Sequence, residues 1–116
     1  MWSYEFYRDR KGDEPVREFI LSLDQKPRGK VLQAIQILSE FGPTLPFPYS
    51  SQVEGKLREL RAHYGKTLYR ILYYQDAQGI FILLHAFEKK TLKIPEREIK
   101  IARERMFDHQ TRKGGK

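Results

Sequence analysis

The chain has 116 residues, which is enough for one domain with a single core. Lysine and arginine number 22 against 15 acidic residues, so the formal net charge is +7 and polyanionic partners are favoured. Because cysteine is absent, disulfide frameworks, thiol nucleophiles and cysteine-based zinc sites are excluded. No apolar run approaches the ~20 residues that span a bilayer, and the first residues lack a signal-peptide layout. We therefore expect a cytoplasmic protein without membrane insertion.

The first half of the chain predicts one strand and two helices. Aromatic residues alternate with polar ones over residues 2–6, which is the period-two pattern of a half-buried strand. Apolar residues at helical spacing predict a short helix after Asp13 and a longer helix that starts near Asp24 and ends at Gly42. Residues 42–51 contain three prolines among apolar side chains, which predicts an ordered loop packed against the domain.

The second half predicts an antiparallel meander followed by a helix. Three strand-like runs occupy residues 56–61, 68–75 and 80–87, and turn signals separate them. Pro95 then opens a helix, and three of its apolar residues share one face: Ile99, Ala102 and Met106. The predicted order is therefore βααβββα.

These elements predict a single small α+β domain whose antiparallel sheet packs against helices. The domain is expected to occupy residues 1–109. Residues 110–116 read as a basic disordered tail, because residues 112–116 combine three positive charges with two glycines.

An arginine in the second strand of the meander stands out. In the apolar run 68–74, alternation places Arg70 on one face and its neighbours Tyr69 and Ile71 on the other. Two interpretations stay open from the sequence alone. In the first, Arg70 forms an ion pair with a carboxylate such as Glu59 on the neighbouring strand, and in the second it holds a phosphate.

Further cations surround the same predicted strands. Lys56 and Arg58 share one face of the first strand, and Arg61 lies on the other. Charged residues of this kind also occur on ordinary strand edges, where they oppose aggregation. Lys89 and Lys90 directly follow the third strand, at an end where sheets commonly present functional groups.

Motifs for metal and nucleotide chemistry are absent. The three histidines show no ligand spacing, and the chain contains neither a glycine-rich phosphate loop nor a serine-hydrolase elbow. We therefore expect no metal and no cofactor. Cationic and phenolic groups remain as candidate catalysts.

Four segments in sequence order carry a resemblance to a known family. They are residues 56–61 (KLRELR), 68–73 (LYRILY), 83–90 (LLHAFEKK) and 94–99 (IPEREI). Together they resemble the RelE/ParE toxin superfamily, and most closely its phage-derived HigB-like branch. The resemblance implies a toxin that enters the ribosomal A site and cuts messenger RNA without a metal. It also implies a cognate antitoxin, which in such systems often carries a helix-turn-helix.

The resemblance assigns roles to individual residues. Arg70 resembles the family's phosphate-holding arginine, and Arg61 is the second candidate for stabilising charge. Lys89 and Lys90 lie where the family has a basic residue that faces the scissile phosphate. Weaker candidates for proton transfer are Tyr64 and His85. Residues expected to contact RNA are Lys56, Arg58, Lys66 and Lys93.

Two other functions stay open at this point. A ParE-like inhibitor of DNA gyrase would share the fold without being a nuclease. A plain nucleic-acid or ribosome-binding module would use the same cations only to hold phosphates. The cluster of cations around one sheet favours RNA cleavage over gyrase inhibition, whereas the binding module stays open.

Overall fold

The computed structural model describes residues 1–89 and 91–114. The elements in chain order are β1 (Tyr4–Phe6), α1 (Pro15–Leu21), α2 (Gln25–Phe41), the short 3-10 turn η1 (Gly42–Thr44), β2 (Ser50–Glu54), β3 (Leu57–Tyr64), β4 (Thr67–Gln75), β5 (Phe81–Lys89) and α3 (Glu96–Gly114). The strands form one five-stranded sheet in the order β1-β5-β4-β3-β2. The predicted α+β fold is confirmed.

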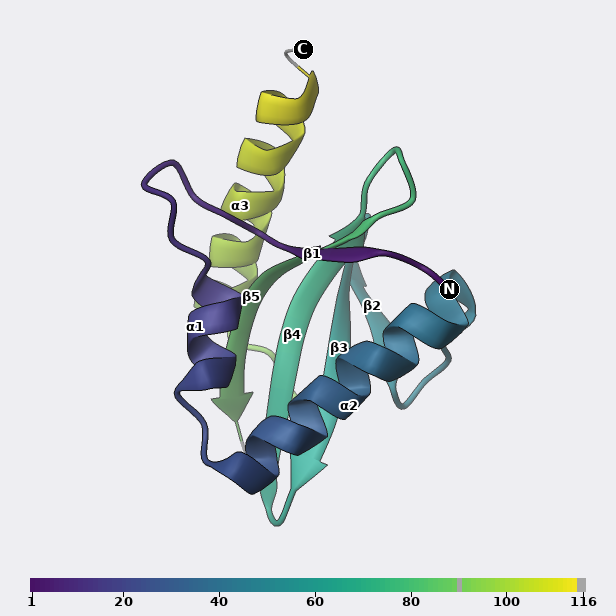
Figure 1. Cartoon of the computed structure of the whole chain (residues 1–116), viewed down its shortest axis with the longest axis vertical. Coiled ribbons are helices and arrows are strands. Elements are labelled where there is room, and N and C mark those ends of the chain that lie inside the picture. The colour runs from purple at the N-terminus through teal and green to yellow at the C-terminus, as the bar shows by residue number, and fades with distance from the viewer. Residues whose placement is uncertain (90, 115–116) are drawn as a thin grey trace.

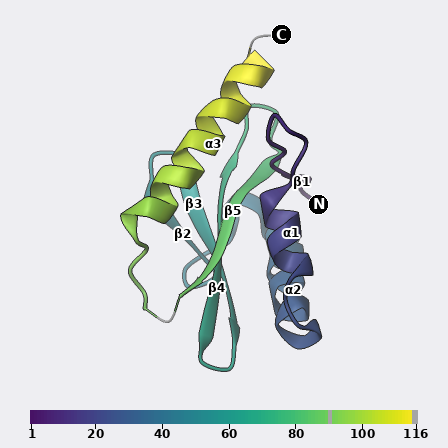
Figure 2. The same ribbon diagram turned by 90° about the vertical axis from the view of Figure 1, so that its left-hand side faces the viewer.

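The helices lie on both faces of the sheet. Figure 1 shows α1 and α2 crossing one face, and Figure 2 shows α3 on the opposite side of the strands. Strands β2 to β5 form the antiparallel meander, whereas β1 pairs with β5 in parallel, so the sheet is mixed. Period-two alternation reveals that residues 2–6 are extended but not in which direction they pair.

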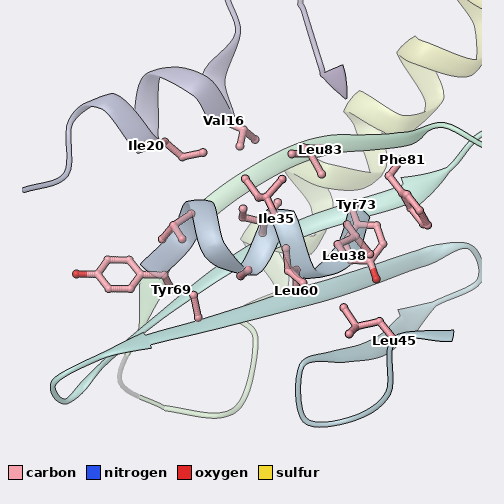
Figure 3. Packing of buried hydrophobic residues seen from close by; sticks show 14 residues of the cluster. Val16, Ile20, Ile35, Leu38, Leu45, Leu60, Tyr69, Tyr73, Phe81 and Leu83 are labelled. Atoms are coloured by element: carbon pink, nitrogen blue, oxygen red, sulfur yellow. The ribbon is translucent and has the colours of Figure 1, made fainter. Parts of the chain in front are cut away.

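The core on the α1 and α2 side is the larger of two apolar clusters. Figure 3 shows Ile35 and Leu38 of α2 gathered with Leu60 and Tyr73 of the sheet. All four side chains are buried. Helix α2 carries this face because its apolar residues recur every three or four positions.

The second cluster lies between the sheet and α3. Ala102 is fully buried there, with Ile99 and Met106 packed beside it, so the predicted apolar face of this helix is confirmed. The sheet side is built from buried residues of β4 and β5: Leu72, Tyr74, Ile82 and Leu84. Both faces of the central strands are thus covered along much of their length, as their nearly continuous apolar sequences require.

Two features differ from the sequence-based expectation. Strand β2 begins within the predicted loop, and its residues Ser50–Glu54 include a single apolar residue. An edge strand pairs on one side only, so it needs little apolar sequence and escapes pattern recognition. The preceding loop packs down through Leu45, but Phe47 and Tyr49 are 68% and 52% exposed.

The last helix continues past residue 109, where the sequence suggests that the folded domain ends. Helix α3 runs to Gly114, and Arg112 donates a 2.7 Å hydrogen bond to Asp108 one turn earlier. An i,i+4 ion pair of this kind extends a helix by local contacts. Residues 115–116 of the expected tail lie outside the described residues. Within the described ranges, no helix is long and apolar enough to cross a membrane.

Candidate nucleic-acid interface

Two cross-strand rows of side chains define the candidate site. The register sets Arg61 of β3 opposite Arg70 of β4, and Arg70 opposite Phe87 of β5. Phe87 belongs to the cluster beneath α3, so this row lies on the α3 face of the sheet. The next row toward the β3–β4 turn contains His63, Leu68 and Lys89. The alternation that is visible in the sequence therefore unites Arg61, Arg70 and Lys89 on one face.

A buried carboxylate joins the two arginines. Glu59 is 1% exposed and accepts hydrogen bonds at Oε1 from Arg61 Nε and, at 3.2 Å, from Ser51 Oγ. Its other oxygen, Oε2, lies 3.7 Å from Arg70 Nη1. The ion pair between Arg70 and Glu59 that the sequence suggests as one alternative is thus present. Because two guanidinium groups share one carboxylate, the cluster keeps one net positive charge.

Arg70 itself is completely buried, with 0% exposure. Its Nη2 donates a 2.7 Å hydrogen bond to the carbonyl oxygen of Thr91, just beyond β5. Among the described residues, neither Nε nor Nη1 has a hydrogen-bond partner. Burial lowers the pKa of Arg70, Glu59 opposes this shift, and Arg61 adds to it. The guanidinium still carries its charge, since arginine is not deprotonated in proteins.

Arg61 is the accessible member of the pair. Its side chain is 15% exposed, and its guanidinium carbon lies 5.1 Å from the centre of the Phe47 ring. Nε is bound to Glu59, and no hydrogen bond is formed by the two terminal nitrogens within the described part of the chain. These nitrogens are therefore free to bind a phosphate in the bidentate manner that arginine favours.

Other predicted cations lie at the same end of the sheet. Lys66 in the β3–β4 turn and Lys93 in the loop after β5 are exposed, and Lys89 at the end of β5 is half-buried. Lys90 lies outside the described residues. Lys89 belongs to the row that contains His63 and Leu68, and Lys66 lies in the turn next to it.

His85 is held beneath α3 rather than presented to a ligand. An extra residue in β5, at the register shift opposite Leu72, turns the imidazole toward α3. Its Nε2 lies 2.6 Å from Glu98 Oε1, and Arg105 Nη1 lies 3.2 Å from its Nδ1. A guanidinium only donates, so Nδ1 is the acceptor and the proton lies on Nε2. Burial lowers the pKa of His85, the hydrogen bond to Glu98 opposes this, and Arg105 reinforces it.

Three predicted residues lie elsewhere. Tyr64 is on the opposite face of β3, beside Lys26 and Lys30 of α2. Lys56 occupies the β2–β3 turn at the far end of β3. Arg58 lies on the face of β3 opposite to Arg61, and its Nε donates a 3.1 Å hydrogen bond to Ser50 Oγ. The structure thus separates these residues from the row that contains Arg61 and Arg70.

The structure also adds residues that sequence reasoning did not select. His63 shares the α3 face with Arg61, and its i,i+2 spacing on one strand is the signal that identifies it. Thr91 contacts Arg70 through its backbone, so no side-chain pattern reveals it. Within residues 1–89 and 91–114, no group of three or more metal-binding side chains is found.

Comparison with known proteins adds a family to this geometry. The family model described as "Phage derived protein Gp49-like (DUF891)" matches residues 18–107, which is most of the chain. The chain belongs to this Gp49-like family. It is a RelE/Gp49 toxin-like family, so membership agrees with a toxin of a toxin–antitoxin system and suggests an antitoxin partner. The Gp49-like family is associated with RelE-type toxins that are endoribonucleases. No curated protein matches the chain.

Proposed function

We propose that this Gp49-like chain is a HigB-like toxin that cuts messenger RNA in the ribosomal A site, in the cytoplasm. The observation that carries the proposal is the row in which Arg61 and Arg70 share the single carboxylate of Glu59. A structural ion pair needs one cation for each carboxylate, and the second cation leaves positive charge for a ligand. Family membership supports the same reading.

The proposed phosphate site centres on Arg61. Its terminal nitrogens bind the scissile phosphate, and the half-buried Lys89 approaches from the neighbouring row. Arg70 acts from beneath as a positioning residue, because it is fully buried and holds Glu59, which in turn orients Arg61. Arg70 can touch RNA directly only when the groups that bury it move, because its side chain is 0% exposed. Fixed cations of this kind stabilise the charge that builds on a pentacoordinate phosphorus.

The proposed reaction needs no group beyond protein and RNA. A base removes the proton of the ribose 2′-hydroxyl, and the 2′-oxygen forms a bond to the adjacent phosphorus. The bond from phosphorus to the 5′-oxygen breaks, and an acid gives that oxygen a proton. The products are a 2′,3′-cyclic phosphate and a 5′-hydroxyl.

The proton-transfer groups are proposed from position. His63 is exposed on the row next to Arg61, and imidazole is the commonest general base in proteins. Lys89 lies two strands away in the same row and is the proposed acid. Tyr64 and His85 are less suited, since Tyr64 lies on the opposite face and the nitrogens of His85 are bound by Glu98 and Arg105.

The test is cleavage of an end-labelled messenger in a translation extract, with and without the purified chain. We expect wild-type protein to cut, and Arg61→Ala to lower the rate by about 100-fold, the usual loss for one donor that stabilises transition-state charge. Lys11→Ala is the matched control, because Lys11 is an exposed cation in the loop before α1. Circular dichroism confirms that each variant is folded.

Each other outcome has a meaning. A folded Arg61→Ala variant that cuts at the wild-type rate contradicts the assigned site. Intact messenger together with cut DNA trapped on gyrase would replace the proposal with the ParE-like alternative. Binding of RNA without any cleavage would leave only the nucleic-acid-binding module.

A further inference from the structure

A groove that the proposed reaction does not use lies between α2 and β3. Its volume is about 220 Å³, and aliphatic side chains of both elements line it: Ala34, Ile37, Leu60 and Ala62. Pro48 and Tyr49 form a further wall. A second hollow of about 440 Å³ shares Lys30 and Gln33 with the first, so the two are continuous along α2. Together they form one groove beside β3.

The backbone edge of β3 is open along this groove. Pairing with β2 ends at Leu60 and Ser50, followed by one more hydrogen bond of 3.0 Å from Arg61 N to Tyr49 O. Strand β3 continues to Tyr64, past the point opposite Ser50 where β2 begins (Figure 1). The backbone N–H and C=O groups of successive strand residues point to alternate sides. Those of His63 therefore point to the same side as those of Arg61, which is the side on which β2 pairs. No strand pairs with that side of His63 in the described part of the chain.

Two aromatic side chains are exposed next to the open edge. Phe47 and Tyr49 are 68% and 52% exposed, and Phe47 is held in place beneath the Arg61 guanidinium. Aromatic residues are enriched in the buried centres of protein–protein interfaces. Two of them beside an aliphatic groove therefore indicate a surface that a protein partner covers.

The charges around the groove indicate which charge that partner carries. Among the described residues, those that line the two hollows include Lys26, Lys30 and Arg61, and none of them is acidic. An occupant with acidic side chains at the rim would be attracted, and a basic one would be repelled. The apolar floor requires that the occupant also carry aliphatic side chains.

We propose that an extended, acidic segment of a partner protein adds to the open edge of β3 and buries alternate aliphatic side chains in this groove. An extended segment presents side chains on two sides, so one set enters the groove while the acidic set faces the lysines. Backbone hydrogen bonds to His63 supply the pairing. The inference rests on the proposed function only in naming the partner as the antitoxin.

Single-stranded RNA fits this surface less well. Phosphates would gain nothing from the aliphatic floor, and the backbone N–H and C=O groups of His63 suit another strand. The terminal nitrogens of Arg61, which are the proposed phosphate ligands, belong to a side chain on the α3 face of β3, whereas the groove lies on the α2 side. RNA is therefore kept as an outcome of the test.

The test begins with a phage-displayed library of random decapeptides, selected on the purified chain. Enriched peptides are synthesised with a fluorophore, and their Kd values are measured by anisotropy. We expect acidic residues alternating with valine or isoleucine, and amide NMR shifts confined to residues 30–37 and 60–64. Lys30→Glu is expected to weaken binding about tenfold. His63→Pro removes the outward N–H and is expected to weaken binding as well.

Arg17→Glu is the matched control, because Arg17 is an exposed cation on α1 away from the groove. It should bind within about twofold of wild type. Failure to enrich any peptide, enrichment of basic peptides, or binding unaffected by Lys30→Glu overturns the proposal, as does displacement of the peptide by oligouridine. The measurement contains neither ribosome nor messenger. The peptide result can therefore be interpreted even if the chain does not cut RNA. Conversely, an absence of peptide binding does not contradict the nuclease proposal.

Discussion

At the scale of single residues, the candidate site depends on an unequal ion cluster. Glu59 has two cationic neighbours, whereas Arg70 has one carboxylate neighbour and a carbonyl. Removing the carboxylate leaves two arginines facing each other. Removing Arg70 leaves Glu59 still bound to Arg61. The two changes should therefore differ strongly in their effect on stability.

We expect Glu59→Gln to lower the free energy of unfolding by about 3–5 kcal/mol, which is typical when one partner of a buried pair is removed. Arg70→Met keeps much of the side-chain volume and is expected to cost less than about 1.5 kcal/mol. Urea denaturation, followed by circular dichroism, measures both values. An Arg70→Met variant that is at least as unstable as Glu59→Gln would show that the cluster is not organised around the carboxylate.

A second residue-scale prediction concerns pH. Burial lowers the pKa of His85 below the ordinary 6.5, so the unfolded chain takes up this proton first as the pH falls. His85 therefore supports folding above about pH 6.5, and this support is lost below it, by up to about 1.4 kcal/mol per pH unit.

The measurement is the free energy of unfolding between pH 7.5 and pH 5. His85→Gln should flatten its decrease below pH 6.5. His63→Gln is the control, since His63 is exposed and forms no hydrogen bond within the described residues. Equal slopes for wild type and His85→Gln would refute the neutral, buried imidazole.

How far the site follows from the sequence depends on the kind of contact. Alternation along β3 and β4 is sufficient to predict that Arg61 and Arg70 share a face. The ion pair between Arg70 and Glu59 is one of the two interpretations that the sequence allows. The hydrogen bond from Arg70 to Thr91 is not predictable, because a backbone carbonyl accepts it and no side-chain pattern reports that carbonyl. The position of His85 is equally hidden, because the extra residue in β5 changes the alternation at that point.

At the scale of elements, the N-terminal strand is fixed to the end of α2 by contacts far apart in sequence. Trp2 N donates to Ser39 O at 2.8 Å, and Ser39 Oγ donates to Trp2 O at 2.7 Å. The Trp2 ring lies against Gly42, which ends α2 with a φ of 61°. A side chain at this glycine would overlap the indole ring. The glycine is thus needed for both its backbone conformation and its missing side chain.

We expect Gly42→Ala to lower the free energy of unfolding by about 1–3 kcal/mol, the range for a strained backbone position. It should also change the fluorescence of Trp2, which is the only tryptophan in the chain. Gly65→Ala is the matched control, because Gly65 has the same φ of 61° and open space where a Cβ would lie. An unchanged emission spectrum in Gly42→Ala would contradict the close packing of Trp2 on this turn.

The elements themselves were predictable where their own sequence carries the pattern. The three helices, the first strand and the meander follow from apolar spacing and turn residues, and the structure confirms them. Strand β2 was missed because its neighbour β3, rather than its own composition, makes it a strand. The parallel pairing of β1 with β5 joins residues 4–6 to residues 81–83, a contact that no local pattern reports.

At the scale of the whole molecule, the charge of +7 matters less than its distribution along the sheet. Arg61, Lys66 and Lys89 lie toward the β3–β4 turn, whereas Lys56 and Arg58 lie toward the opposite end of β3. Composition counts these residues equally. The structure divides them between two ends, and a single RNA-binding site at the β3–β4 turn would use only the first group.

Two turn lysines offer a matched test of this division. Lys56 and Lys66 are both exposed, and each follows a glycine with positive φ in a β-turn. We expect Lys66→Ala to reduce the salt dependence of binding to a single-stranded RNA oligomer, with the slope of log K against log salt falling by about 0.7, the value for one lost phosphate contact. Lys56→Ala should leave the slope unchanged. Anisotropy titrations between 50 and about 300 mM salt measure both slopes. Equal reductions in the two variants would mean that RNA binds along the whole of β3, because only a ligand that reaches both turns can release counterions at both ends.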